Sequence, residues 1–223
     1  MEKDFFPLIF QFFDLKTAMN SMTVNKFYYK VAKNNRLWNR LCLKNSFPTD
    51  VDPNQYINYK KCHIISKWCI KKNIFSVPSL ILSHINLTSI PPELGNLSNL
   101  ETLYLNDNQL TSIPPEVENL SNLKELYLQN NNLTSIPPEL GNLSSLKKLY
   151  LHNNNLTNVP PELGNLSNLE TLYLNNNQLT SIPPELGNLS NLETLYLNNN
   201  QLTSIPPELE NLNNLKYFIL LDV

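Results

Sequence analysis

The chain has 223 residues and a formal net charge of -2, and 41% of its residues are hydrophobic. This length holds one or two domains with a buried core. The charge is uneven, because residues 1–76 contain 13 Lys and Arg against 5 Asp and Glu, whereas residues 77–223 contain 4 against 14. The sequence has no apolar run of about 18 residues and no basic, cleavable secretory lead. We therefore expect a soluble intracellular protein with no membrane partner.

The first third is predicted to form a small all-α domain, residues 1–47. Residues 14–33 carry apolar side chains at helical spacing, among them Met22 and Val31. A further helix is predicted around Trp38. Helices this short leave little core, so the same apolar residues are expected to serve both packing and docking.

The order of features in residues 9–38 resembles the F-box: an aliphatic-rich opening, a hydrophobic-aspartate boundary, a helix with valine and a later aromatic residue, and a closing leucine-tryptophan pair. Here those features are Ile9-Phe10, Phe13-Asp14, Val24 to Tyr28, and Leu37-Trp38. The chain departs from the family at its start, where Met1-Glu2 replaces the usual Leu-Pro and Pro7 stands at a helical leucine. The resemblance implies docking to a Skp-type adaptor of a cullin-RING ubiquitin ligase. The residues carried over for this contact are Ile9, Phe10, Phe13, Val24, Leu37 and Trp38.

Residues 48–76 are predicted to be a helical linker that caps the first edge of the following repeats, with Trp68 in its core. The lysines of the first third are spread along predicted helices, and the only arginines are Arg36 and Arg40. Nucleic-acid recognition usually needs arginine in a fixed geometry. We interpret the basic residues as a solvated surface and predict no nucleic-acid partner.

From Leu100 onward the chain repeats one pattern of leucines every 23 residues, which predicts a solenoid. The complete pattern L-x-x-L-x-L-x-x-N-x-L opens at Leu100, Leu123, Leu146, Leu169 and Leu192. Leucines at the first, fourth and sixth positions alternate as in a strand with one buried face, so stacked copies form a parallel sheet. The asparagine at the ninth position is expected to hydrogen-bond buried backbone groups of neighbouring turns. This ladder comprises Asn108, Asn131, Asn154, Asn177 and Asn200.

Paired prolines follow each ladder asparagine, as Pro114-Pro115 follows Asn108. Proline cannot donate to a second sheet or lie inside a helix, so the outer side is expected to be extended and then briefly helical or turned. Pro92 and Glu93 suit the first turn of such a helix, where a missing N–H is harmless and a carboxylate is favoured.

These residues resemble leucine-rich repeats of the typical 23-residue, intracellular class. The expected fold class is α/β: a leucine-rich repeat solenoid over residues 77–223, preceded by the F-box-like domain. It has a parallel sheet on the concave face, an extended or short-helical convex side and about seven units, the last truncated. Ile85 stands at the ladder position of the first unit, and the last unit has no dedicated cap. We expect weak self-association through that edge, at Ile219, Leu220 and Leu221.

The residues between the leucines predict a target-binding concave face dominated by a column of tyrosines. These are Tyr104, Tyr127, Tyr150, Tyr173 and Tyr196. Tyrosine combines rigid contact area with a hydroxyl group, although it also suits a residue that merely covers the sheet, and both interpretations stay open. The columns beginning at Asn106 and Asp107 are expected to form a polar floor. A small charged patch is expected where the copies differ, at Lys124, Lys147, Lys148 and His152.

No catalytic residue, metal ligand or cofactor is predicted, so we expect a protein that is not an enzyme. The histidines are far apart in the chain, and all four glycines occupy one repeat position. Cys62, His63 and Cys69 lack a fourth metal ligand, and together with Cys42 they are expected to be reduced thiols.

The two resemblances together imply a substrate-recognition subunit of a Skp/cullin/F-box-type ubiquitin ligase, in which the solenoid binds an unknown protein substrate. The alternative is a leucine-rich repeat scaffold without ligase function, for example one that binds a small GTPase. The expected location is the cytoplasm or the nucleus, or the host cytoplasm if the gene is viral.

Overall fold

The structure is a computed structural model that describes residues 78–220 of the chain. The six predicted adaptor-binding residues, the predicted helical domain and the predicted cap lie outside the described residues. Their boundaries at residues 47 and 76 therefore stay predictions.

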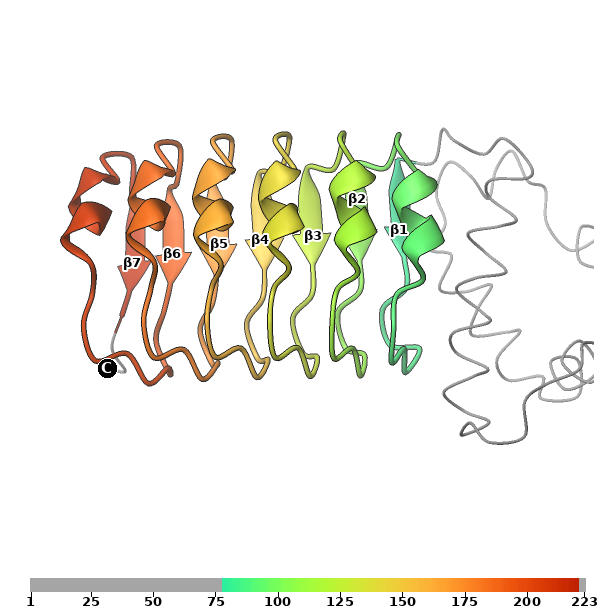
Figure 1. The fold of residues 1–223 in the computed structure, drawn as a ribbon, viewed down its shortest axis with the longest axis horizontal. Helices are drawn as coiled ribbons and strands as arrows, with labels where there is room; N and C mark the ends of the chain where they lie inside the picture. The colour runs from blue at the N-terminus through green and yellow to red at the C-terminus, as the bar shows by residue number, and fades with distance from the viewer. Residues whose placement is uncertain (1–77, 221–223) are drawn as a thin grey trace, which may run out of the picture. The chain divides into compact units, whose positions relative to one another are not determined.

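Seven parallel strands of three residues each form one sheet in chain order (Figure 1). Each residue pairs with the residue 23 positions later, as Leu103 pairs with Leu126, so every repeat has the same register as the next. The strands are β1 (Ser79–Ile81), β2 (Thr102–Tyr104), β3 (Glu125–Tyr127), β4 (Lys148–Tyr150), β5 (Thr171–Tyr173), β6 (Thr194–Tyr196) and β7 (Tyr217–Ile219). This parallel sheet confirms the predicted solenoid.

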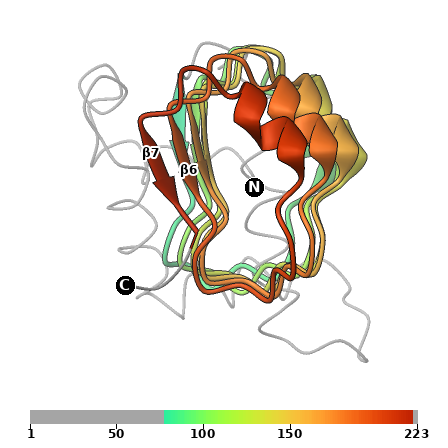
Figure 2. The same ribbon diagram turned by 90° about the vertical axis from the view of Figure 1, so that its left-hand side faces the viewer.

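Six short 3-10 helices lie on the opposite side of the stack from the sheet (Figure 2). Each begins at the second proline of a proline pair, after a first proline in extended conformation, and carries a glutamate in its first turn, as Pro91, Pro92 and Glu93 do. The helices are η1 (Pro92–Asn96), η2 (Pro115–Asn119), η3 (Pro138–Asn142), η4 (Pro161–Asn165), η5 (Pro184–Asn188) and η6 (Pro207–Asn211). The predicted extended and briefly helical outer side is confirmed.

Leucines from every repeat fill the space between the sheet and the 3-10 helices. The middle residue of each strand points into this core, and Leu149 of β4 is completely buried between the equivalent leucines of its neighbours. At the last strand the same position holds Phe218, which remains 45% exposed, and Tyr217 is 62% exposed. The core thus ends on an uncovered hydrophobic strand, β7, in the described residues.

The repeated glycine position has a packing explanation. A Cβ atom at Gly164 would collide with the backbone carbonyl oxygen of Glu185 in the next turn. Glycine therefore lets neighbouring 3-10 helices approach closely. Within the described residues, no helix is long and apolar enough to cross a bilayer.

Candidate protein-binding face

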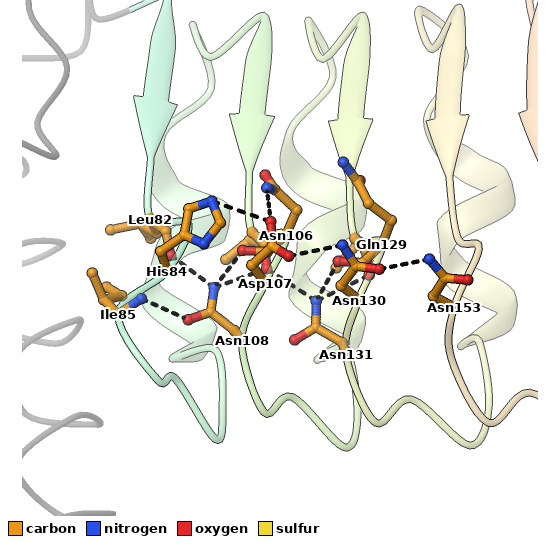
Figure 3. Close-up of polar contacts among 12 residues, drawn as sticks. Leu82, His84, Ile85, Asn106, Asp107, Asn108, Gln129, Asn130, Asn131 and Asn153 are labelled. Atoms are coloured by element: carbon orange, nitrogen blue, oxygen red, sulfur yellow. Dashed lines mark hydrogen bonds and ion pairs between the residues drawn. The ribbon is translucent and has the colours of Figure 1, made fainter.

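A ladder of buried asparagines closes the strand ends, as the sequence predicts (Figure 3). The Asn131 side-chain amide donates to the carbonyl oxygens of Leu105 and Leu128, each at 3.0 Å, and the N–H of Leu110 donates to its Oδ1 at 3.0 Å. The same bonds recur at the other ladder asparagines. Because each amide bonds its own turn and the preceding one, the ladder fixes the position of every strand on the sheet face.

A second ladder of amides lies one position earlier in each repeat (Figure 3). Asn130 donates to Asp107 at 2.7 Å, Asn153 donates to Asn130 at 2.7 Å, and the series continues to Asn199. His84 closes it at the N-terminal side, with its Nε2 atom 3.2 Å from Asp107. This column was predicted to be part of an open polar floor. Instead its side chains bond one another, which leaves less of their capacity for a partner.

The backbone explains why this second ladder favours Asn, Asp or, at its first position, His84. Asp107, Asn130, Asn153, Asn176 and Asn199 all have positive φ angles, between 55° and 58°. Asn and Asp tolerate this left-handed conformation better than other non-glycine residues. Asn or Asp at this position in five successive copies is the sequence signal from which this second ladder could be predicted.

The five predicted tyrosines come together as one continuous column along the sheet face. Tyr104 stacks on Tyr127 with ring centroids 4.5 Å apart, and Tyr127 stacks on Tyr150 at 4.7 Å. Tyr173 stacks on Tyr196 at 4.4 Å. Stacked rings with few rotatable bonds present contact area at a low entropic cost. The column is therefore a preorganised aromatic surface.

The stacking is interrupted in the middle of the column. Tyr150 and Tyr173 meet edge to face, with ring planes at 81° and centroids 5.0 Å apart. His152 lies beside this break, 6.3 Å from Tyr150 and 5.7 Å from Tyr173 between ring centroids. Its Nδ1 atom and the Oδ1 atom of Asn175 in the next repeat are covered and have no hydrogen-bond partner among the described residues. The centre of the face thus presents aromatic edges, and the two polar atoms beside them are buried.

Lys148 belongs to a hydrogen-bonded network with the tyrosine column. Its ammonium group lies 2.9 Å from Glu125, and the Tyr127 hydroxyl donates to the same carboxylate at 2.9 Å. The hydrogen bond from Lys148 holds the pKa of the Glu125 carboxyl below its ordinary value. Burial, and to a smaller extent the hydrogen bond to Glu125, raises the pKa of the Tyr127 hydroxyl. The predicted charged patch is thus internally paired here.

The residue directly before each strand from β2 to β7 is charged, and we call these six residues the charged column. They are Glu101, Lys124, Lys147, Glu170, Glu193 and Lys216. Neighbours pair at 2.9 Å for Lys124 with Glu101, 2.7 Å for Lys147 with Glu170 and 2.8 Å for Lys216 with Glu193. Two of the three lysines, Lys124 and Lys147, belong to the predicted charged patch, whereas the glutamates were not predicted, although the spacing of 23 residues marks all six residues as one column.

The described residues contain no group of three or more His, Cys, Asp and Glu side chains that could hold a metal ion. What the face offers is aromatic area and paired charges. These are the components of a protein-protein contact surface.

Comparisons with known proteins agree with this architecture. A family model described as a leucine-rich repeat region matches residues 61–175, and a model of leucine-rich repeats in two copies matches residues 167–211. The chain belongs to the leucine-rich repeat family. The matching models include no F-box, so that resemblance stays a prediction. Comparison with curated protein sequences gives no match.

The solved structures that resemble this chain include a bacterial leucine-rich repeat protein and a plant receptor. A leucine-rich repeat protein of Leptospira interrogans is 36% identical, with a TM-score of 0.55 over 66% of this chain and 44% of its own. The plant peptide hormone receptor RGFR1, solved in complex with RGF2, is 37% identical, with a TM-score of 0.55 over 60% of this chain and 22% of its own. This chain therefore spans less than half the length of either relative.

We expect the free energy of unfolding to fall more steeply in the wild type than in a His152→Asn variant between pH 7 and pH 5.5. Burial lowers the pKa of His152 from its ordinary value of 6.5, against the opposing charge of Asp107. As the pH falls through about 6.5, the unfolded chain binds a proton that the folded chain binds only at lower pH, so stability is lost. Urea denaturation of both proteins at the two pH values checks this, and identical losses would contradict it.

Proposed function

We propose that this chain binds a partner protein through the face of its sheet, with the tyrosine column as the main contact. The observation that carries this proposal is the preorganised row of five tyrosines, which offers aromatic area on a rigid sheet. Aromatic side chains are enriched among the residues that dominate binding energy at protein interfaces. Support also comes from the related plant receptor, whose structure is of a complex with RGF2.

We further propose that the chain is a substrate receptor of a Skp/cullin/F-box-type ubiquitin ligase, located in the cytoplasm or the nucleus. This proposal is supported by the F-box resemblance of residues 9–38, which would dock the adaptor while the sheet face holds the substrate. The alternative is a repeat scaffold that binds its partner, for example a small GTPase, without an adaptor. Adaptor binding separates the two.

A pull-down of the full chain with a purified Skp-type adaptor tests the ligase proposal. Wild-type chain is expected to retain the adaptor, and Trp38→Ala and Val24→Asp are expected to lose it while their circular dichroism stays unchanged. Tyr127→Ser is the matched control, because it alters the sheet face and leaves residues 9–38 intact. A folded wild-type chain that retains no adaptor would support the scaffold alternative.

Site-specific photocrosslinking tests the use of the sheet face. A photoactivatable phenylalanine in place of Tyr150 is expected to form an adduct with a defined partner in an extract of the source cells. The same probe in place of Glu162, which is exposed on η4 of the outer side, is expected to form none. Adducts from both positions, or from position 162 alone, would contradict a partner on the sheet face.

The exposed strand β7 supports a separate proposal of weak self-association at the C-terminal edge. Tyr217, Phe218 and Ile219 are exposed there, and an edge strand with unpaired backbone groups favours pairing with another chain. Leu221 lies outside the described residues.

A further inference from the structure

The charged column has an order of signs that, when reversed, gives the opposite sign at every position. From β2 to β7 the residues before the strands are negative, positive, positive, negative, negative and positive. From β7 to β2 the signs are positive, negative, negative, positive, positive and negative, which is the opposite sign at each successive position. Two copies of this column, placed side by side in opposite order, would therefore put every charge against its opposite.

We propose that the sheet face binds a second copy of this chain in opposite repeat order, about a two-fold axis parallel to the strands and passing between β4 and β5. The facing pairs are Glu101 with the partner's Lys216, Lys124 with the partner's Glu193, Lys147 with the partner's Glu170, and the three symmetry-equivalent pairs. This inference rests on the proposed use of the sheet face for protein binding. The proposed partner is a second copy of this chain.

The column also selects one register among the alternatives. A shift by one repeat in one direction puts Lys147 against the partner's Lys147, and a shift in the other direction puts Glu170 against the partner's Glu170. Like charges placed opposite each other disfavour an arrangement, and complementary charges fix the register of an interface. Only the unshifted arrangement pairs all six residues with opposite charges, as a two-fold symmetric contact requires.

The interruption of the tyrosine column falls at the same level as the proposed axis. Tyr150 and Tyr173 meet at 81°, whereas the three other neighbouring tyrosine pairs are stacked. In the two-fold arrangement Tyr150 faces the partner's Tyr173, so the contact centres on four rings. At the same level, His152 faces the partner's Asn175.

The pairs within one chain leave room for this contact. The side chains of the charged column are between 39% and 60% exposed, so each paired lysine still reaches solvent. An isolated exposed pair contributes little, while a network of several charges contributes more. Around the axis, Lys147 and Glu170 of both copies would form a four-membered network of alternating charge.

Sedimentation velocity of full-length chains tests the proposal through charge reversal. Lys147→Glu and Glu170→Lys each turn the two central attractions into repulsions, so each variant alone is expected to raise the dimer dissociation constant about tenfold or more. An equimolar mixture of the two variants is expected to restore the dimer, because each variant then faces the opposite charge. The pair within each chain stays broken in the mixture, so recovery reports a contact between copies.

Glu162→Lys is the matched control, since it makes the same charge change on the outer side. It is expected to dimerise as the wild type does, and its mixture with Lys147→Glu is expected to contain less dimer than the mixture of Lys147→Glu with Glu170→Lys. Phe218→Ser removes apolar area at the C-terminal edge, and a dimer that persists in this variant does not depend on that edge.

The proposal is overturned if the wild type stays monomeric up to about 1 mM, corresponding to a binding free energy weaker than about -4 kcal/mol. It is also overturned if the single variants dimerise as the wild type does, or if their mixture shows no recovery. The photocrosslinking result is scored separately by the mass of the adduct. A monomeric chain with a different protein bound at position 150 contradicts only the dimer, and absence of any adduct at position 150 contradicts the use of the face itself.

Discussion

Replacing Leu149 by alanine is expected to lower the free energy of unfolding by about 3 kcal/mol. Leu149 is completely buried between Leu126 and Leu172, so the truncation leaves a cavity that neighbouring turns cannot close without breaking their shared register. Equilibrium urea denaturation followed by far-ultraviolet circular dichroism measures the loss.

Phe218 supplies the control, because it occupies the equivalent position in the last strand. The Phe218→Ala variant removes more atoms than Leu149→Ala, yet we expect a loss of only about 1 kcal/mol, since the ring is already 45% exposed. Equal losses at the two positions would show that the core continues past β7 by some other contact.

Replacing Asn154 by alanine is expected to cost about 3 kcal/mol by a different mechanism. Its Oδ1 accepts the N–H of Leu133 at 3.0 Å, and its amide donates to the carbonyls of Leu128 and Leu151. Those carbonyls keep the bonds from the ladder asparagines on either side, but the buried N–H of Leu133 has no other hydrogen-bond acceptor among the described residues. An unsatisfied buried donor costs about 1 to 3 kcal/mol, and the lost bonds add to this.

Asn155→Ala is the matched control for the ladder. Asn155 is the adjacent residue and is exposed, and its side chain accepts only a 3.3 Å bond from Gln178. Its replacement is expected to change the free energy of unfolding by less than about 0.5 kcal/mol. Similar losses for Asn154→Ala and Asn155→Ala in urea denaturation would contradict a special role for the buried ladder.

The sheet, its register and the buried ladder could be predicted from the sequence because each depends on contacts between identical positions of successive repeats. Leu103 and Leu126 have one burial pattern, so the period alone places them side by side. Proline pairs likewise determine the structure of the outer side, since their missing N–H groups exclude a second sheet and the interior of a helix.

The candidate site could be predicted only in part. The tyrosine column follows from the period, but the ring orientation at Tyr150 and Tyr173 depends on packing beside His152, which the repeat pattern does not specify. The glutamates of the charged column do not stand out in the sequence, because their effect depends on pairing with a lysine in a neighbouring turn. Backbone conformation decided the second ladder, where positive φ angles direct Asn130 and its equivalents toward one another.

Because equivalent residues are always 23 positions apart, removal of one whole repeat affects the solenoid and its charged column differently. Removal of residues 125–147 would join Lys124 to Lys148 and leave every remaining strand, ladder bond and core contact with an equivalent neighbour. The charged column would then have five members, and its central Glu170 would face its own copy. Gain or loss of a single repeat, a common event in duplicated genes, would thus preserve the solenoid while changing which surfaces recognise each other.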